Sequence, residues 1–356
     1  MPSRSSADTG PLLSGALDNA QIPHQSLCVI NDSISFSGLN IFKETLARGI
    51  RRGEETTLIS ILHPPEILLP SSTSSKINVI DLSNSINGYG EESTSIESIK
   101  EKILSTYTSG QIFIDALDIL SEDYSASKVL SLVKSILSAI KKAKAPSRLV
   151  LLLPPSSTIY HSLVTPSFHS TLTLITPHSP PLVEHLSKSY LSPISSIPSP
   201  NLWMILENTT KRSTHQDMAL KASSEKIEFD PCWTQSLGGP AAIVQVLVRK
   251  PTGGIKGISR SLEGLKLDDD KKQFRVVDLD QLVDLNPFSK PLTAGVSAGD
   301  KTINTHSELD LPFNLSLTDE QRNKRAQVPL PYAHEGEGAS GDLIWEDEEE
   351  TDDEEI

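Results

Sequence analysis

Residues 27–42, LCVINDSISFSGLNIF, combine an apolar run, a polar turn with one glycine, and the start of a helix. A strand that passes through such a turn into a helix is where nucleotide-binding α/β folds place their phosphate loop. That loop needs several glycines, whose backbone N–H groups close around a phosphate, and a lysine to balance its charge. Here only Gly38 is present, and Lys43 lies inside the following helix. The stretch therefore has the position of a phosphate loop and lacks its residues.

The first half of the chain alternates between strand and helix patterns. Short apolar runs predict strands, and apolar residues three or four positions apart predict helices. Strands that are apolar on both faces and separated by helices are typical of a mostly parallel sheet covered by helices on both faces. The expected strands are residues 26–31, 56–62, 77–82, 112–117 and 148–153, and the expected helices are 38–50, 95–107 and 125–143.

The second half predicts an antiparallel edge to this sheet. Apolar runs at 170–176 and 202–208 indicate two more strands. Residues 241–250 and 255–264 then flank the turn sequence Pro-Thr-Gly-Gly, which favours a hairpin, and 274–279 predict a further strand. We therefore expect an α/β fold with a mostly parallel sheet and an antiparallel hairpin edge.

The composition divides the chain into five parts. Residues 1–24 contain Ser, Pro and Gly with weak periodicity, which predicts a flexible N-terminus. The compact domain is expected over 25–284, because the sequence beyond it turns polar and rich in Pro and Gly. The remaining parts are a linker at 285–311, a patterned segment at 312–341 and an acidic tail at 342–356.

The net charge of −14 is concentrated at the C-terminus. The acidic tail holds ten acidic residues and no basic one, so −14 without these ten charges leaves −4 for the rest of the chain, which can carry basic surface. The two cysteines, Cys28 and Cys232, indicate no disulfide framework and favour a reducing compartment. No apolar run approaches the roughly 20 residues that a membrane helix needs. These features predict a soluble protein of the cytoplasm and nucleus.

A second element of a nucleotide site would be an apolar strand that ends in an aspartate able to hold magnesium. The segment IFIDALDIL supplies Asp115 and Asp118 in that context. An aspartate at the end of a strand more commonly caps the next turn, and a phosphate-loop site needs the glycine-lysine cradle as well. We therefore assign no catalytic, cofactor-binding or metal-binding residue. A diverged NTPase that uses Asp115 remains the enzymatic alternative.

Basic residues gather along the predicted hairpin. They are Arg249, Lys250, Lys256 and Arg260, on both arms of a glycine-rich tip. Such a group suits contacts with RNA phosphates. A run of charge is more often a solvated face, and no aromatic side chains lie among these cations to stack on bases.

The segment before the acidic tail, FNLSLTDEQRNKRAQVPLPYAHEG, has the clearest pattern outside the domain. Phe313, Leu315 and Leu317 alternate strictly, and a short helix is predicted next, with Thr318 as its N-cap and Gln321 three residues on. This pattern is too short for a separate core and is typical of a segment that orders along a partner surface. We predict that Phe313, Leu315, Leu317 and Tyr332 bind a partner.

Three stretches of the sequence resemble the fungal Elongator complex protein 5 family. They are STLTLITPHSPPLVEHL at 170–186, AAIVQVLVRKPTGGIKGISRSLEG at 241–264, and the FNLSLTDEQ segment at 313–336 that runs into the acidic end. The resemblance implies a RecA-like domain without working nucleotide motifs. It also implies a hetero-hexameric ring with Elongator proteins 4 and 6, which binds tRNA and assists the catalytic Elongator subassembly that modifies the wobble uridine.

The expected function is therefore that of a non-catalytic, ring-forming scaffold subunit that needs no cofactor of its own. This function agrees with two features of the sequence: the phosphate-loop position lacks its glycines and lysine, and the segment at 312–341 has the pattern of a partner-binding segment. Two alternatives stay open: the diverged NTPase, and a binding module whose acidic tail engages basic proteins.

Overall fold

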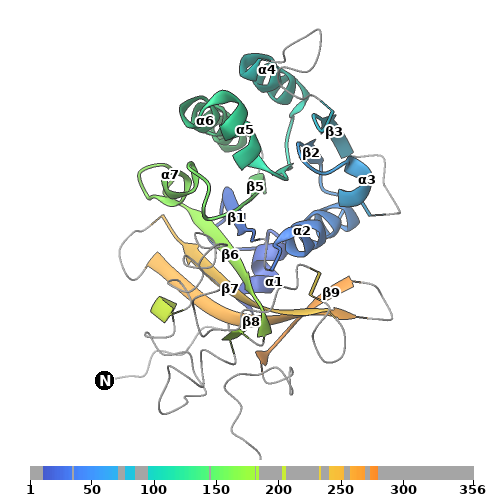
Figure 1. Ribbon diagram of the computed structural model, residues 1–356, viewed down its shortest axis with the longest axis vertical. Coiled ribbons are helices and arrows are strands. Elements are labelled where there is room, and N and C mark those ends of the chain that lie inside the picture. The colour runs from blue at the N-terminus through green and yellow to red at the C-terminus, as the bar shows by residue number, and fades with distance from the viewer. Residues whose placement is uncertain are drawn as a thin grey trace, which may run out of the picture. The chain divides into compact units, whose positions relative to one another are not determined.

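The computed structural model describes eleven stretches of the chain, all within the first of two units, which spans residues 1–292 (Figure 1). The second unit is 293–356. The expected linker, the patterned segment and the acidic tail lie outside the described residues. The described stretches are 11–33, 36–70, 77–84, 95–143, 146–180, 182–183, 203–205, 232–233, 240–251, 257–268 and 273–279.

One sheet of nine strands organises the described part of the chain. Its order is β3-β2-β4-β5-β1-β6-β7-β8-β9; the pairings from β3 to β6 are parallel and those from β6 to β9 antiparallel. The α/β fold with an antiparallel edge is thus confirmed. The strands are β1 Leu27–Asn31, β2 Thr56–Ser60, β3 Ile77–Asp81, β4 Gln111–Ile114, β5 Arg148–Leu153, β6 Leu172–His178, β7 Ala241–Arg249, β8 Ile258–Asp268 and β9 Gln273–Val277.

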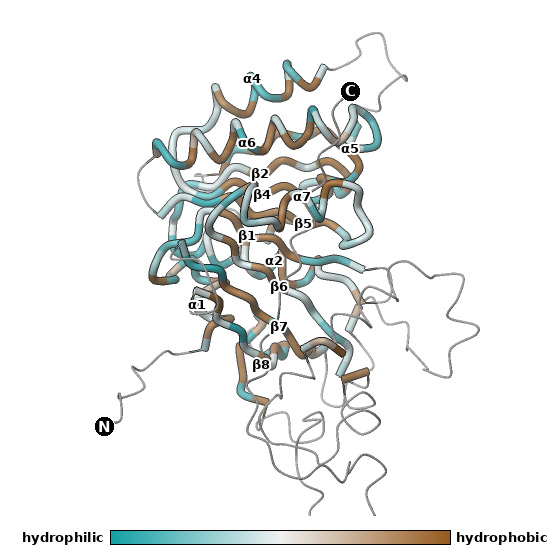
Figure 2. Tube along the Cα trace, turned by 90° about the vertical axis from the view of Figure 1, so that its left-hand side faces the viewer, coloured by the Kyte–Doolittle hydropathy of each residue, from teal (hydrophilic) through white to brown (hydrophobic). Residues whose placement is uncertain are grey.

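Helices cover both faces of the sheet, as the apolar strands require. One core cluster joins the sheet to α4, α5, α6 and α7, and a second joins its other face to α1, α2 and α3 (Figure 1). Figure 2 shows the central strands as largely hydrophobic, whereas α4 and α6 alternate between hydrophobic and hydrophilic residues. The helices are α1 Leu12–Leu17, α2 Leu39–Arg51, α3 Pro65–Leu68, α4 Ile96–Thr106, α5 Leu117–Tyr124, α6 Ala126–Lys142 and α7 Tyr160–Val164. Within the described ranges, no helix has the length and apolar character needed to cross a membrane.

The predicted strand at 112–117 is too long in the structure. β4 ends at Ile114 and α5 begins at Leu117. Asp115 lies between them and directs its carboxylate to the loop after β2. The strand therefore ends at the residue before Asp115, whose carboxylate accepts backbone N–H groups of the loop after β2.

The predicted strand at 202–208 is wrong at its described residues, since 203–205 are helical. Trp203 and Ile205 pack on a small cluster that contains Val183, Ile243 and Leu262. A short apolar run is compatible with either a buried strand or a buried helical turn, and tertiary packing decides between them.

The prediction of a flexible N-terminus over 1–24 is wrong for the described residues, because α1 lies within it. Leu13, Ala16 and Leu17 of this helix are fully buried in the second core cluster. A helix of six residues is too short to show a clear apolar period. Its stability comes from contacts that are distant in the sequence.

Candidate functional site

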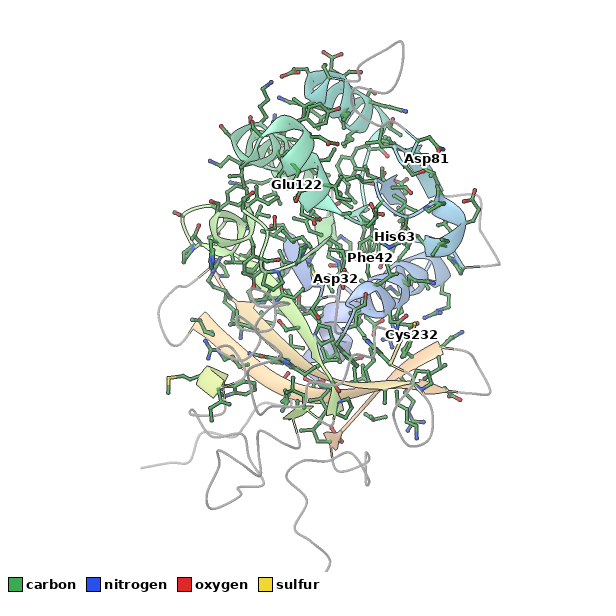
Figure 3. The ribbon with its side chains drawn as sticks, viewed as in Figure 1. Asp32, Phe42, His63, Asp81, Glu122 and Cys232 are labelled. Atoms are coloured by element: carbon green, nitrogen blue, oxygen red, sulfur yellow. The ribbon has the colours of Figure 1, made fainter. Side chains whose placement is uncertain are left out.

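The loop after β1 contains its own anion at the place where a nucleotide fold would hold a phosphate. Asp32 Oδ1 accepts hydrogen bonds from the backbone N–H of Gly38 at 2.7 Å, the Ser37 hydroxyl at 2.9 Å and the backbone N–H of Ser33 at 3.0 Å. Backbone N–H and hydroxyl donors at the start of a helix are the groups that phosphate loops direct at a phosphate. Here the donors to Asp32 are occupied by a side chain of the loop itself (Asp32 is labelled in Figure 3).

Gly38 is the one glycine of this loop, and its role is steric. A Cβ atom at this position would lie 2.3 Å from the carbonyl oxygen of Asn31, so even alanine would force the backbone to move. Its φ of −78° is ordinary for any residue. The glycine therefore allows the helix start to approach β1, and it does so without building a phosphate cradle.

Two aromatic side chains cover the same loop. The rings of Phe36 and Trp233 stack with centroids 5.1 Å apart and planes 5° from parallel. The indole N–H of Trp233 donates to the carbonyl oxygen of Ser37 at 3.0 Å, and Trp233 also meets the ring of Phe274 edge-on. Trp233 is fully buried. The loop is thus packed against apolar rings where a nucleotide phosphate would need polar, accessible surface.

Asp115, the candidate magnesium ligand, is engaged inside the protein. Its carboxylate accepts the backbone N–H groups of Ile61 at 2.6 Å, Leu62 at 3.2 Å and His63 at 2.8 Å. Nδ1 of His63, labelled in Figure 3, lies 3.1 Å from the same carboxylate. Residue Asp115 as a whole is 1% exposed. Asp115 therefore anchors the loop after β2, which agrees with the turn-capping alternative, and its carboxylate is not accessible to a bound metal ion.

Asp118, at the start of α5, is a half-buried carboxyl near this edge of the sheet. Burial raises its pKa, and the charges of Glu122 and Asp32 add to this effect. No three His, Cys, Asp or Glu residues in the described ranges are grouped to hold a metal ion.

Among the hairpin cations that the structure describes, Arg249 is used within the fold. The Arg249 guanidinium donates to the carbonyl oxygens of Val164 at 2.6 Å and His169 at 2.8 Å, and more weakly to those of Thr165 and Ser170 at 3.3 Å. Its pKa is lowered by burial. Arg249 therefore fastens the loop after α7 to the end of β7, and its donors serve the fold.

Lys250 and Arg260 are the other hairpin cations within the described residues. Arg260 is exposed on β8, opposite Leu247 of β7, and Lys250 is half-buried at the end of β7. Lys256 lies outside the described residues, as do Phe313, Leu315, Leu317 and Tyr332. Lys250 and Arg260 are thus the predicted RNA contacts that the structure leaves at the surface.

Sequence reasoning missed Asp32 and Trp233, the residues that fill the phosphate-loop position. Asp32 lies six positions before Gly38, outside the spacing of any helix-capping rule. Trp233 is 196 positions away from the backbone that it contacts. No local signal predicts either contact.

A family model described as Elongator subunit Iki1 matches residues 12–346. The match begins at the first residue of α1 and includes all nine strands and the segment that contains Phe313. Comparison with the curated proteins gives no match. The family match spans nearly the whole chain and agrees with the resemblance carried by the hairpin and the C-terminal segment, and the chain therefore belongs to the Elongator subunit Iki1 family.

Proposed function

We propose that this chain is a non-catalytic structural subunit of the Elongator complex, which forms a RecA-like hetero-hexameric ring with Elongator proteins 4 and 6, two copies of each. Family membership supports the place in Elongator. The sheet, with helices packed on both of its faces, supplies a rigid body for such an assembly. The patterned segment at 312–341 supplies apolar anchors that bind across a subunit boundary.

The ring binds tRNA and supports modification of the wobble uridine by the catalytic Elongator subassembly, in the cytoplasm and nucleus. The acidity of this chain lies mainly in its last residues, so the remaining surface does not repel a polyanion strongly. Arg260 and Lys250 are the surface cations of this chain that we assign to tRNA phosphates.

The observation that carries the non-catalytic role is the engagement of both nucleotide-site carboxylates. Asp32 is bonded within the loop after β1, and Asp115 is bonded to the loop after β2. A magnesium-dependent NTPase needs an open phosphate cradle and an accessible acid. The NTPase hypothesis predicts that the unmodified chain hydrolyses ATP and that an Asp115→Asn variant hydrolyses it more slowly. The scaffold role predicts equal background rates of ATP hydrolysis for the unmodified chain and the variant.

The deciding experiment is the mass of the chain, alone and co-expressed with Elongator proteins 4 and 6, measured by light scattering on a sizing column. We expect a single species that contains two copies of each subunit. A monomer that binds neither partner would refute the proposal.

We predict that replacing Phe313, Leu315 and Leu317 together by Asp weakens this assembly, because the charged side chains remove the apolar anchors. The matched control is a deletion of residues 346–356, which should leave the assembly intact. If the deletion breaks assembly and the triple variant does not, the acidic-tail alternative replaces the proposed one. Pull-downs with the sister subunits measure both.

A further inference from the structure

We propose that the Asp32 carboxylate is the resident anion of the loop after β1: it takes the place of a bound phosphate and holds the loop in the conformation on which Trp233 docks. This inference is independent of the ring and concerns the isolated chain as well as the assembly.

The first support is the charge requirement of α2. The helix has 13 residues, begins after Gly38 without a side-chain cap, and has no acidic residue in its first turn. The N-terminus of a helix is partially positive and is stabilised by a nearby negative charge. Asp32 supplies that charge from the end of β1, at 2.7 Å from the Gly38 N–H.

The second support is the convergence of donors on a single oxygen. Two backbone N–H groups and one hydroxyl all reach Asp32 Oδ1. If the carboxylate is removed, these donors lose a charge-assisted acceptor in a partly buried loop, which raises the free energy of this conformation. A small free anion can then restore it, because the same donors suit a phosphate oxygen.

The third support is the segment that docks on the loop. Trp233 belongs to the connection between β6 and β7, and it contacts the loop through the Phe36 ring and the Ser37 carbonyl oxygen. Its own backbone has a φ of 60°, a left-handed conformation that a tryptophan rarely adopts. The docking surface exists only while Phe36 and Ser37 are held in place, so Asp32 controls the position of a residue 201 positions away in the sequence.

The test compares the full chain with its Asp32→Ala variant, both carrying Trp203→Phe and Trp345→Phe so that Trp233 is the one fluorophore. In the variant we expect the emission of Trp233 to shift to the red as the indole meets water. We also expect amide exchange at Gly38 to become on the order of ten- to a hundredfold faster, the factor for one charge-assisted hydrogen bond.

Inorganic phosphate provides the anion-specific readout. Compared with chloride at equal ionic strength, phosphate should shift the emission of the Asp32→Ala variant back to the blue and slow its exchange at Gly38, and should leave the unmodified loop unchanged. Asp118→Ala, which removes a nearby carboxylate from α5, is the matched control and should behave like the unmodified loop.

Either of two results overturns the proposal. One is an Asp32→Ala variant whose emission and exchange equal those of the unmodified loop; the other is a perturbed variant that responds equally to phosphate and chloride. If Asp32→Ala does not fold, Asp32→Asn retains one acceptor oxygen without the charge. Exchange at Gly38 in that variant must still be faster than in the unmodified loop, and equal rates refute the proposal.

Discussion

Asp32 and Asp115 follow β1 and β4, the strands on either side of β5. In a nucleotide-binding fold these two positions carry the phosphate loop and the metal-binding acid. In this chain each carboxylate instead accepts backbone N–H groups of the protein itself. Each carboxylate therefore anchors a loop at a position where a nucleotide-binding fold would bind its ligand.

We expect Asp115→Asn to lower the free energy of unfolding by about 2–4 kcal/mol. The amide keeps one acceptor but loses the charge, and its NH₂ group meets backbone donors of residues 61–63 in a buried site. Urea unfolding measures the change. Asp81→Asn is the control: Asp81 is exposed and its carboxylate accepts hydrogen bonds from Ser83, two positions away, so its change should stay within about 0.5 kcal/mol. Equal effects of the two substitutions would contradict the anchoring role of Asp115.

His178 gives the fold a defined pH dependence. Burial lowers the pKa of this imidazole from 6.5 to about 4, and a hydrogen bond to Gln245 Oε1 at 3.0 Å only partly offsets the effect of burial. Between pH 6.5 and 4 the unfolded chain therefore binds a proton that the folded chain does not. Stability should fall as the pH falls through this window, by about 3 kcal/mol in total from this group.

The measurement is urea unfolding from about pH 7 to about pH 4 for the unmodified chain and for His178→Gln, which keeps a donor toward Gln245. The difference between their unfolding free energies should shrink as the pH falls. A constant difference would show that His178 does not titrate in this window.

Among the elements, α1 is held at both of its ends by side chains that are distant in the sequence. Both Glu263 carboxylate oxygens lie 3.2 Å from the Leu13 N–H at its first turn. The buried Arg148 guanidinium donates to the carbonyl oxygens of Ala16 and Leu17 at its end, and to Gln111 Oε1 at 2.8 Å. A negative group at the start and a positive group at the end both complement the helix dipole, so α1 is fastened to β5 and β8 at its two ends.

Burial raises the pKa of Glu263 and lowers that of Arg148, which shows that each charge is held at a cost in solvation. We expect Arg148→Lys to destabilise the fold by about 2–4 kcal/mol, because lysine lacks the planar fork that reaches Gln111 and two carbonyls at once. Hydrogen exchange and limited proteolysis of residues 12–17 should show α1 opening first.

Arg52→Lys is the control for this substitution. Arg52 makes surface ion pairs with Asp18 and Glu54, and its replacement should change stability by less than about 1 kcal/mol. Protection of α1 in Arg148→Lys equal to that in the unmodified chain would refute the fastening of α1 by Arg148.

At the scale of the whole molecule, the proposed tRNA contact depends on which cations the fold leaves available. We expect charge reversal of Lys250, Lys256 and Arg260 in the assembled ring to weaken tRNA binding and to reduce the salt dependence of the affinity. The slope should fall by about one unit for each phosphate that the variant no longer neutralises. Binding titrations at several salt concentrations measure both quantities.

Arg249→Gln separates this role from a structural one. Its guanidinium is bonded to carbonyl oxygens after α7, so the substitution should lower the unfolding free energy and leave the salt slope of tRNA binding unchanged. A loss of tRNA affinity in Arg249→Gln, without a loss of stability, would reverse the assignment.

The periodic elements and the class of fold can be predicted from the amino-acid sequence. Strand and helix patterns depend on neighbours a few positions apart, and the predicted stripe of α6, from Val129 to Ile140, is buried in the structure as expected. The absence of the glycines and lysine of a phosphate loop could also be seen directly, since that motif is local. The end of β4 at Ile114 could not be predicted from the sequence, because it depends on hydrogen bonds between Asp115 and a loop 52 to 54 positions earlier in the chain.

The partners of the polar side chains cannot be predicted from the sequence, because they depend on contacts between distant segments. Arg249 looks like its neighbours Lys250 and Arg260 in the sequence, yet it alone reaches the carbonyls after α7. Arg148 donates a hydrogen bond to a carbonyl oxygen at the end of α1, 132 positions away in the sequence. Trp233 donates one to the carbonyl oxygen of Ser37, 196 positions away. Apolar patterning is averaged over many residues and survives in the local sequence, whereas a hydrogen bond depends on one pair of atoms that folding alone brings together.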